Sequence, residues 1–248
     1  MLKNVEKMSL NYSPNFYLKK RSISKVKYLI FHYTGMKSEN GAIKKLTNKN
    51  SKVSCHYFIK RNGLIILMVP EVYVAWHAGK SNWKNDHSLN QKSIGIEISN
   101  KGHQFGYEKF SKNQIISLIK LSKYLIKKYN IKASNILGHS DIAFERKKDP
   151  GEKFPWQKLY KNKIGIWHDL NKEKLLNKRR KKISKIEQKI FIQNLIKIGY
   201  SRNIKRKDFN FLNKLIKAFQ RRFRQELING VIDQECLLIS KNILKKFK

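Results

Sequence analysis

The sequence predicts an α/β fold, a mixed central sheet flanked by helices, followed by a small all-α domain at the C-terminus. Three observations predict it. Short segments of β-branched and aromatic residues alternate irregularly with helical segments, one pair of strands forms a hairpin, and after Trp167 helical spacing of apolar residues takes over. With 248 residues, the chain has room for one sizeable domain and a smaller one. We place the larger domain at residues 1–168, a charged linker at 169–185 and a three-helix domain at 186–248.

Local patterns place the elements of the larger domain. Runs rich in β-branched and aromatic residues predict strands, and a serine that can act as an N-cap marks the start of a helix. The Asn62-Gly63 pair between two apolar runs is a strong hairpin signal. Strands are therefore expected at 26–34, on both sides of 62–63, at 93–99 and at 135–141, and helices after Ser38 and after Ser111.

The composition changes after residue 167. The segment HDLNKEKLLNKRRKKISK is dense in charge and predicts a linker or an exposed helix. From Ile186 onward, apolar residues recur at helical spacing, with NGVID as a turn. The resulting helical domain has about sixty residues, which is near the lower size at which a single domain folds alone.

The net charge is the outlier of the composition. The chain has 55 Lys and Arg against 17 Asp and Glu, a formal net charge of +38. Such a field attracts polyanions, which would favour nucleic acid or a cell-wall polymer as a partner. The basic residues are spread along the whole length, so a biased composition explains them as well. We expect no specific nucleic-acid partner, only some nonspecific attraction to anions.

Cysteine usage and hydropathy bound the environment. Cys55 and Cys236 lie far apart, which gives neither a disulfide framework nor a CxxC metal pair and predicts free, buried thiols. The first 21 residues hold no apolar run long enough for a signal peptide. No segment approaches the roughly 20 apolar residues of a membrane span. We expect a cytoplasmic protein, with the periplasm or cell envelope left open.

Two histidines and one aspartate could bind a metal. His32 lies near the end of a predicted strand, His139 follows Gly138 at the end of another, and Asp149 precedes a Pro-Gly turn. Two histidines and a carboxylate with the fourth position left to water form a known catalytic zinc pattern. His32 is more than a hundred residues from the other two, however, and a lone strand histidine is more often simply packed. Spacing alone leaves both readings open.

Glu97 and Lys147 could carry charge chemistry. In the strand at 93–99, Ile94, Ile96 and Ile98 share one face, so Glu97 points to the other. A carboxylate there is costly unless it is paired or functional, and its functional role would be that of a general base. Lys147 could stabilise an oxyanion. The alternatives are a glutamate paired with one of many lysines and a solvated loop lysine.

An aromatic loop follows the hairpin. The segment AWHAGKSNW holds Trp76, His77 and Trp83 and should be exposed and irregular. Its aromatic side chains could line a groove for a sugar or a peptide. A loop pinned to the core by its tryptophans is about as plausible.

Four separated blocks, LIFHYTGM, VSCHYFIKRNGLIILMVPEVYVAWHAG, SIGIEISNKG and LGHSDIAFERKKDPGEKFPW, occur together in this chain. In order and spacing they resemble the zinc-dependent N-acetylmuramoyl-L-alanine amidases, a family that also includes the peptidoglycan recognition proteins. The resemblance covers roughly residues 20–168. It is closest to the bacterial branch in which the third zinc ligand is aspartate.

The resemblance assigns roles position by position. It implies that a zinc ion is held by His32, His139 and Asp149. Glu97 matches the acidic residue that acts on the attacking water, and Lys147 matches the lysine that steadies the oxyanion. For the substrate groove it implies Trp76, His77 and His56, the last more as a support than as a contact.

The implied reaction is hydrolysis of the amide between N-acetylmuramic acid, or its 1,6-anhydro form, and L-alanine. The partner would be peptidoglycan or a soluble anhydro-muropeptide, and the oligomeric state stays open. LIKAFQRRFRQELINGVIDQECLLI resembles a three-helix peptidoglycan-binding domain, with a generic helical cap as the alternative. Another class of function is a non-catalytic peptidoglycan recognition protein. That reading predicts loss of a zinc ligand, and Asp149 argues against it.

Overall fold

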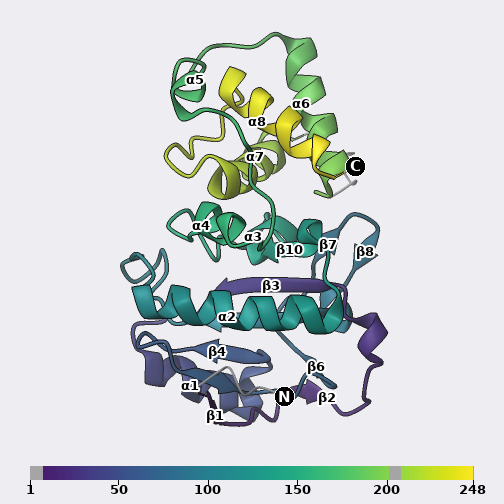
Figure 1. Cartoon of the computed structure of the whole chain (residues 1–248), viewed down its shortest axis with the longest axis vertical. Coiled ribbons are helices and arrows are strands. Elements are labelled where there is room, and N and C mark those ends of the chain that lie inside the picture. The colour runs from purple at the N-terminus through teal and green to yellow at the C-terminus, as the bar shows by residue number, and fades with distance from the viewer. Residues whose placement is uncertain (1–7, 201–207, 248) are drawn as a thin grey trace.

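A six-stranded mixed sheet forms the centre of the computed structural model, which describes residues 8–200 and 208–247 (Figure 1). The strand order is β1-β5-β4-β9-β3-β10, and within it only the β4–β5 hairpin pair is antiparallel. Residues 1–7 lie outside the described part. They belong to the first 21 residues, for which the sequence predicted no signal peptide. The sheet strands are β1 (Met8–Leu10), β3 (Tyr28–Tyr33), β4 (Tyr57–Ile59), β5 (Ile65–Leu67), β9 (Ser93–Ile98) and β10 (Ile136–Gly138). Two small pairs add β2 (Phe16–Tyr17) with β6 (Val74–Ala75) and β7 (Asn82–Trp83) with β8 (Asp86–His87).

The two longest helices of the larger, N-terminal part of the chain follow from their caps and apolar stripes. Helix α1 (Glu39–Thr47) begins after Ser38, whose hydroxyl accepts from the Gly41 amide. Helix α2 (Lys112–Tyr129) begins with a capping box between Ser111 and Gln114. Its leucines belong to the same core cluster as the isoleucines of β9, and Figure 1 shows it lying along the sheet. A second apolar cluster joins α1 to Phe58 and Ile66. The predicted mixed α/β class is therefore confirmed.

Strand pairing puts His32 and Glu97 on the same face of the sheet. In the parallel register of β3 and β9, His32 lies beside Glu97, while Phe31 lies beside Ile96. Because successive side chains alternate between faces, Ile94, Ile96 and Ile98 face the core and Glu97 shares its face with His32. Both residues sit near the carboxyl ends of their strands.

The C-terminal helices pack beyond the β10 edge of the sheet (Figure 1). Two short helices, α3 and α4, lie between that edge and the C-terminal helical unit, by which we mean α5 to α8, and α7 packs on α3. A single apolar cluster runs from the sheet into this unit and includes Phe219 and Phe223. The bounds are α3 (His139–Ile142), α4 (Trp156–Lys161), α5 (Lys172–Leu176), α6 (Lys185–Ile198), α7 (Phe209–Phe223) and α8 (Gln234–Lys245).

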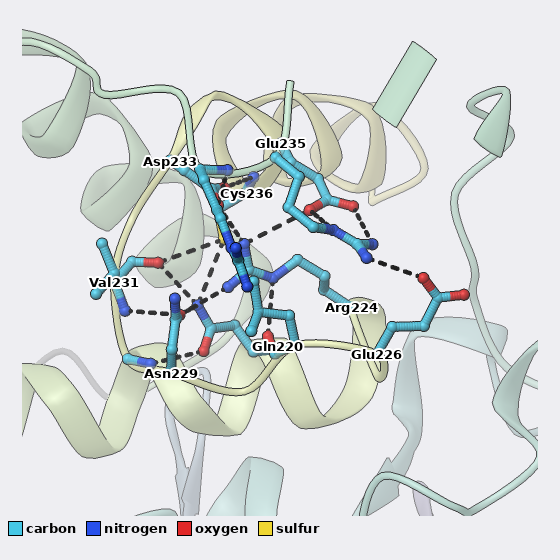
Figure 2. A network of polar contacts seen from close by, with 12 residues as sticks. Gln220, Arg224, Glu226, Asn229, Val231, Asp233, Glu235 and Cys236 are labelled. Atoms are coloured by element: carbon cyan, nitrogen blue, oxygen red, sulfur yellow. Dashed lines mark hydrogen bonds and ion pairs between the residues drawn. The ribbon is translucent and has the colours of Figure 1, made fainter. Parts of the chain in front are cut away.

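A polar network fixes the inside of the C-terminal helical unit (Figure 2). Arg224, at the end of α7, donates to Asp233 at 2.5 Å, and the guanidinium of Arg179 donates to Glu235 at 2.7 and 2.8 Å. Asp233 in turn caps α8. Residues 169–185, expected to form a charged linker or an exposed helix, thus contain α5 and are tied to α8 through Arg179.

Two further expectations can be compared with the structure. Both cysteines are buried and free, as predicted. Within the described residues, no helix is long and apolar enough to cross a membrane.

Candidate metal centre and active site

Three buried ligand atoms meet at the carboxyl end of the sheet. His32 Nδ1, His139 Nδ1 and Asp149 Oδ2 lie 3.0 Å from one another in all three pairs. All three residues are less than a tenth exposed. The structure therefore brings together the two strand-end histidines and the turn aspartate that the sequence marked as metal candidates.

Local structure explains how distant residues converge. Strand β10 pairs in parallel with β3, with Gly138 beside Phe31, so His139 emerges next to His32. The Ser140 amide then donates to the carbonyl of Asp149 at 2.7 Å, which holds the aspartate close to the strand end. Topology supplies the proximity that sequence spacing does not show.

A chain of hydrogen bonds sets the proton on His32. The Ser93 hydroxyl donates to the Leu89 carbonyl at 2.6 Å, so its oxygen accepts from His77 Nε2 at 3.1 Å. His77 Nδ1 is then an acceptor and receives the Nε2 proton of His32 at 3.0 Å. These bonds leave the lone pair of His32 Nδ1 directed at the cluster.

His139 is fixed in the same way. Its Nε2 lies 3.1 Å from the carbonyl oxygen of Ala78, to which it donates, so its Nδ1 also carries a lone pair. Two nitrogen lone pairs and a carboxylate oxygen then face one another at 3.0 Å with no proton between them. That arrangement is repulsive unless a cation sits among the three atoms. Ligand atoms of a tetrahedral zinc ion lie roughly 3.3 Å apart, so the donor set fits such an ion.

The protonation states suit a cation as well. Burial and the neighbouring His139 lower the pKa of His32 to about 4, with Asp149 partly opposing the shift. Burial alone would raise the pKa of Asp149, but the imidazoles of His139 and His32, when protonated, outweigh it and lower that pKa well below its usual range, as a cation in their place would. A neutral histidine and an ionised aspartate at neutral pH are the forms that bind metal.

Glu97 lies beside the cluster on β9. Burial raises the pKa of its carboxyl well above the usual range, the charge of Asp149 adds to the shift, and Lys147 opposes it. The side chain is only half-buried overall, yet its Oε2 is covered and has no hydrogen-bond partner among the described residues. A carboxylate left unpaired in such a place has the character of a functional group.

A cavity of about 520 Å³ opens over these residues. Its lining includes Glu97, Lys147, His139 and Asp149, with Trp76 on its wall. Lys147 is half-buried and lies in the irregular segment before Asp149. A carboxylate, an ammonium and two of the three candidate metal ligands, His139 and Asp149, thus share one solvent-accessible space, with His32 buried behind them.

The remaining aromatic and histidine candidates differ in position. Trp76 is half-buried and packs edge-on against Tyr17, with ring centroids 5.5 Å apart. His77 touches the cavity but uses both ring nitrogens in the chain behind His32. His56 is fully buried and accepts from the Gly95 amide at 3.0 Å. Trp83 is buried against Tyr200, so this part of the loop is pinned to the core.

Ser93 is a site residue that the sequence analysis missed. Its hydroxyl completes the chain from Leu89 through His77 to His32. A serine at the start of a strand carries no signal of that role. Only its pairing geometry could have revealed it.

Comparison with known proteins places the chain. The family model for N-acetylmuramoyl-L-alanine amidase, Amidase_2, matches residues 22–152. The N-acetylmuramoyl-L-alanine amidase AmiD of Escherichia coli K12 is 35% identical over 237 residues, covering 90% of this chain and 84% of AmiD. The 1,6-anhydro-N-acetylmuramyl-L-alanine amidase AmpD of Haemophilus influenzae is 39% identical over 108 residues, covering 43% of this chain and 56% of AmpD.

Solved structures agree with this placement. The complex of E. coli AmiD with anhydro-N-acetylmuramic acid-L-Ala-D-gamma-Glu-L-Lys superimposes with a TM-score of 0.78 at 32% identity, covering 93% of each chain. AMPDH3 of Pseudomonas aeruginosa in complex with anhydromuramic pentapeptide gives a TM-score of 0.78 at 28% identity, covering 96% of this chain and 98% of that one. The match extends over the C-terminal helices as well as the sheet. By sequence and by fold, this chain belongs to the N-acetylmuramoyl-L-alanine amidase family.

Proposed function

We propose that the chain hydrolyses the amide bond between N-acetylmuramic acid and L-alanine in anhydro-muropeptides, with a zinc ion held by His32, His139 and Asp149. The observation that carries the proposal is the convergence of two nitrogen lone pairs and one carboxylate oxygen at 3.0 Å. The family match and the substrate complexes of the relatives support the choice of bond and substrate.

A bound zinc ion would supply a Lewis acid that polarises the substrate carbonyl and lowers the pKa of water toward about 7. Glu97 is placed to act as the general base, since it lines the same cavity as His139 and Asp149 and lies beside His32 in the strand register. Burial raises the pKa of its carboxyl, which suits a group that takes a proton from water and returns it to the leaving amine.

Lys147 would act on the developing negative charge. As the carbonyl carbon becomes tetrahedral, its oxygen gains charge, and a cation on the cavity wall stabilises it. Trp76, on the same wall, offers an apolar face for the substrate. His77 and His56 act from behind the site, by holding His32 and the β9 backbone.

A non-catalytic peptidoglycan recognition protein is the alternative of another class. It would require a missing ligand or a missing base. His32, His139, Asp149 and Glu97 are all present and adjacent, which favours catalysis.

Metal dependence and product identity test the proposal together. The purified chain, treated with chelator and then resupplied with zinc, is incubated with anhydro-N-acetylmuramic acid-L-Ala-D-gamma-Glu-L-Lys. Mass spectrometry should find free anhydro-N-acetylmuramic acid and free tripeptide, only after zinc is restored. Cleavage that survives removal of all metal would overturn the mechanism. A parallel digestion of intact peptidoglycan compares polymer with soluble substrate.

A further inference from the structure

A buried carboxylate next to the metal ligands takes two of its partners from the C-terminal half of the chain. Asp141, in α3, is 1% exposed. Its Oδ2 accepts from the Gly138 amide at 2.8 Å and pairs with Arg222 Nη1, and its Oδ1 accepts from the Tyr200 hydroxyl at 2.8 Å. Arg222 lies on α7, and Tyr200 follows α6.

Arg222 spans both sides of the segment that carries His139. While Nη1 meets Asp141, Nη2 donates to the Ile136 carbonyl at the start of β10 at 2.8 Å. Its guanidinium lies over the Trp156 ring at 4.2 Å from the centroid, and the residue is 4% exposed. One planar side chain therefore clamps residues 136 and 141, with His139 between them.

The clamped segment also positions Asp149. The Ser140 amide holds the Asp149 carbonyl at 2.7 Å. Gly138 is so close to Pro150 that an added Cβ would lie 2.6 Å from Pro150 Cδ. Any displacement of residues 136–141 is thus passed to both His139 and the Asp149-Pro150 turn, because no slack separates them.

We propose that Arg222 and Tyr200 are positioning residues of the metal site, so that the C-terminal helical unit is part of the hydrolytic centre. The family model ends at residue 152, and both residues lie beyond it. The proposal rests on the proposed function, because it assumes that zinc binds at His32, His139 and Asp149. Arg222 and Tyr200 would act on the affinity for that ion and on the geometry of its ligands.

A matched control separates positioning from general stability. Arg224, two residues from Arg222, is equally buried and pairs with Asp233, but its contacts stay inside the C-terminal helical unit (Figure 2). Arg224→Met and Arg222→Met each remove a buried Arg–Asp pair at the same end of α7. Only the second touches residues 136–141.

The experiment measures zinc affinity by competition with a fluorescent chelator, together with kcat and KM, on full-length variants. We expect Arg222→Met to weaken zinc binding about tenfold and to lower kcat more than it changes KM, as loss of outer contacts does in other metal sites. Arg222→Lys should recover part of the loss, because it restores the charge but not the second bond to Ile136. Tyr200→Phe, which removes one hydroxyl, should give a smaller loss in the same direction and serves if Arg222→Met does not fold.

Three results decide the inference, and a fourth tests the proposed function. Zinc affinity unchanged in both Arg222→Met and Tyr200→Phe would overturn the inference, as would an equal loss of affinity in Arg224→Met. Loss in Arg222→Met or in Tyr200→Phe with a normal Arg224→Met would support it. Failure of the wild-type chain to bind zinc would instead count against the proposed function, so the two failures are distinguishable.

Discussion

His32 and His77 share a hydrogen bond behind the proposed metal-binding face: His32 Nε2 lies 3.0 Å from His77 Nδ1. The bond decides which nitrogen of His32 keeps its proton, and it does so through Ser93, whose hydroxyl accepts from the far side of His77. His77, which the sequence suggested for the substrate groove, therefore also orients His32, a proposed metal ligand. Its side chain lines the cavity on one side and holds the His32 imidazole on the other.

The first prediction concerns His77. Replacing it with alanine removes the acceptor for the His32 proton, so the imidazole can rotate or take its other tautomer. We expect His77→Ala to lower zinc affinity by about 10- to 100-fold. His77→Gln, whose amide oxygen can accept the same proton, should recover part of it. Chelator competition measures the zinc affinity of both variants. Equal affinity in His77→Ala and wild type would show that this hydrogen bond does not fix the orientation of His32 as a ligand.

Gly95 provides a second test of the same chain. A Cβ added at Gly95 would lie 2.4 Å from the His77 ring, on a central strand that cannot shift easily. Gly95→Ala should cost about 1–3 kcal/mol of stability. It should also weaken zinc binding, because it displaces His77.

Ile94→Val, on the opposite face of β9, is the control for Gly95→Ala. It should cost about 0.5–1.5 kcal/mol and leave zinc affinity alone. Thermal unfolding and chelator competition on both variants decide the matter. A Gly95→Ala variant with normal affinity would refute the steric argument.

The third prediction concerns Lys147. Its ammonium is proposed to stabilise charge that exists only in the transition state, so Lys147→Met should lower kcat by about 10²–10³-fold and change KM much less. Zinc content should stay normal, since the lysine is not a ligand. The exposed Lys161 on α4 gives the control, and Lys161→Met should be indistinguishable from wild type. A Lys147→Met enzyme that altered only KM would indicate a role in binding.

Sequence patterns were sufficient for the main elements and the fold class, but the strand expected at 135–141 was too long: β10 ends at Gly138, and α3 begins at His139. The strand expected at 26–34 is β3, the Asn62-Gly63 turn joins β4 to β5, and Ser111 caps α2 with a full capping box. These features depend on neighbours in the chain, so local composition reveals them. The α/β class followed because runs of β-branched and aromatic residues alternate with segments of helical spacing, and turn or capping residues separate them.

The site was accessible only in part. From spacing alone, His32 could not be joined to His139, since parallel pairing of β3 with β10 creates their contact across 107 residues. The resemblance supplied the link that spacing lacked. The pairing of Arg222 with Asp141 could be predicted neither from spacing nor from the resemblance, because a chain with 55 basic residues gives no reason to single out one arginine.

The central claim is that Glu97 performs proton transfer beside a zinc ion held by His32, His139 and Asp149. The most direct measurement is bound zinc per chain and cleavage of anhydro-muropeptide, made on the same preparation of Glu97→Gln. The account predicts zinc content equal to that of wild type, with kcat lower by about 10²–10⁴-fold. Cleavage within tenfold of wild type, at full zinc occupancy, would contradict it.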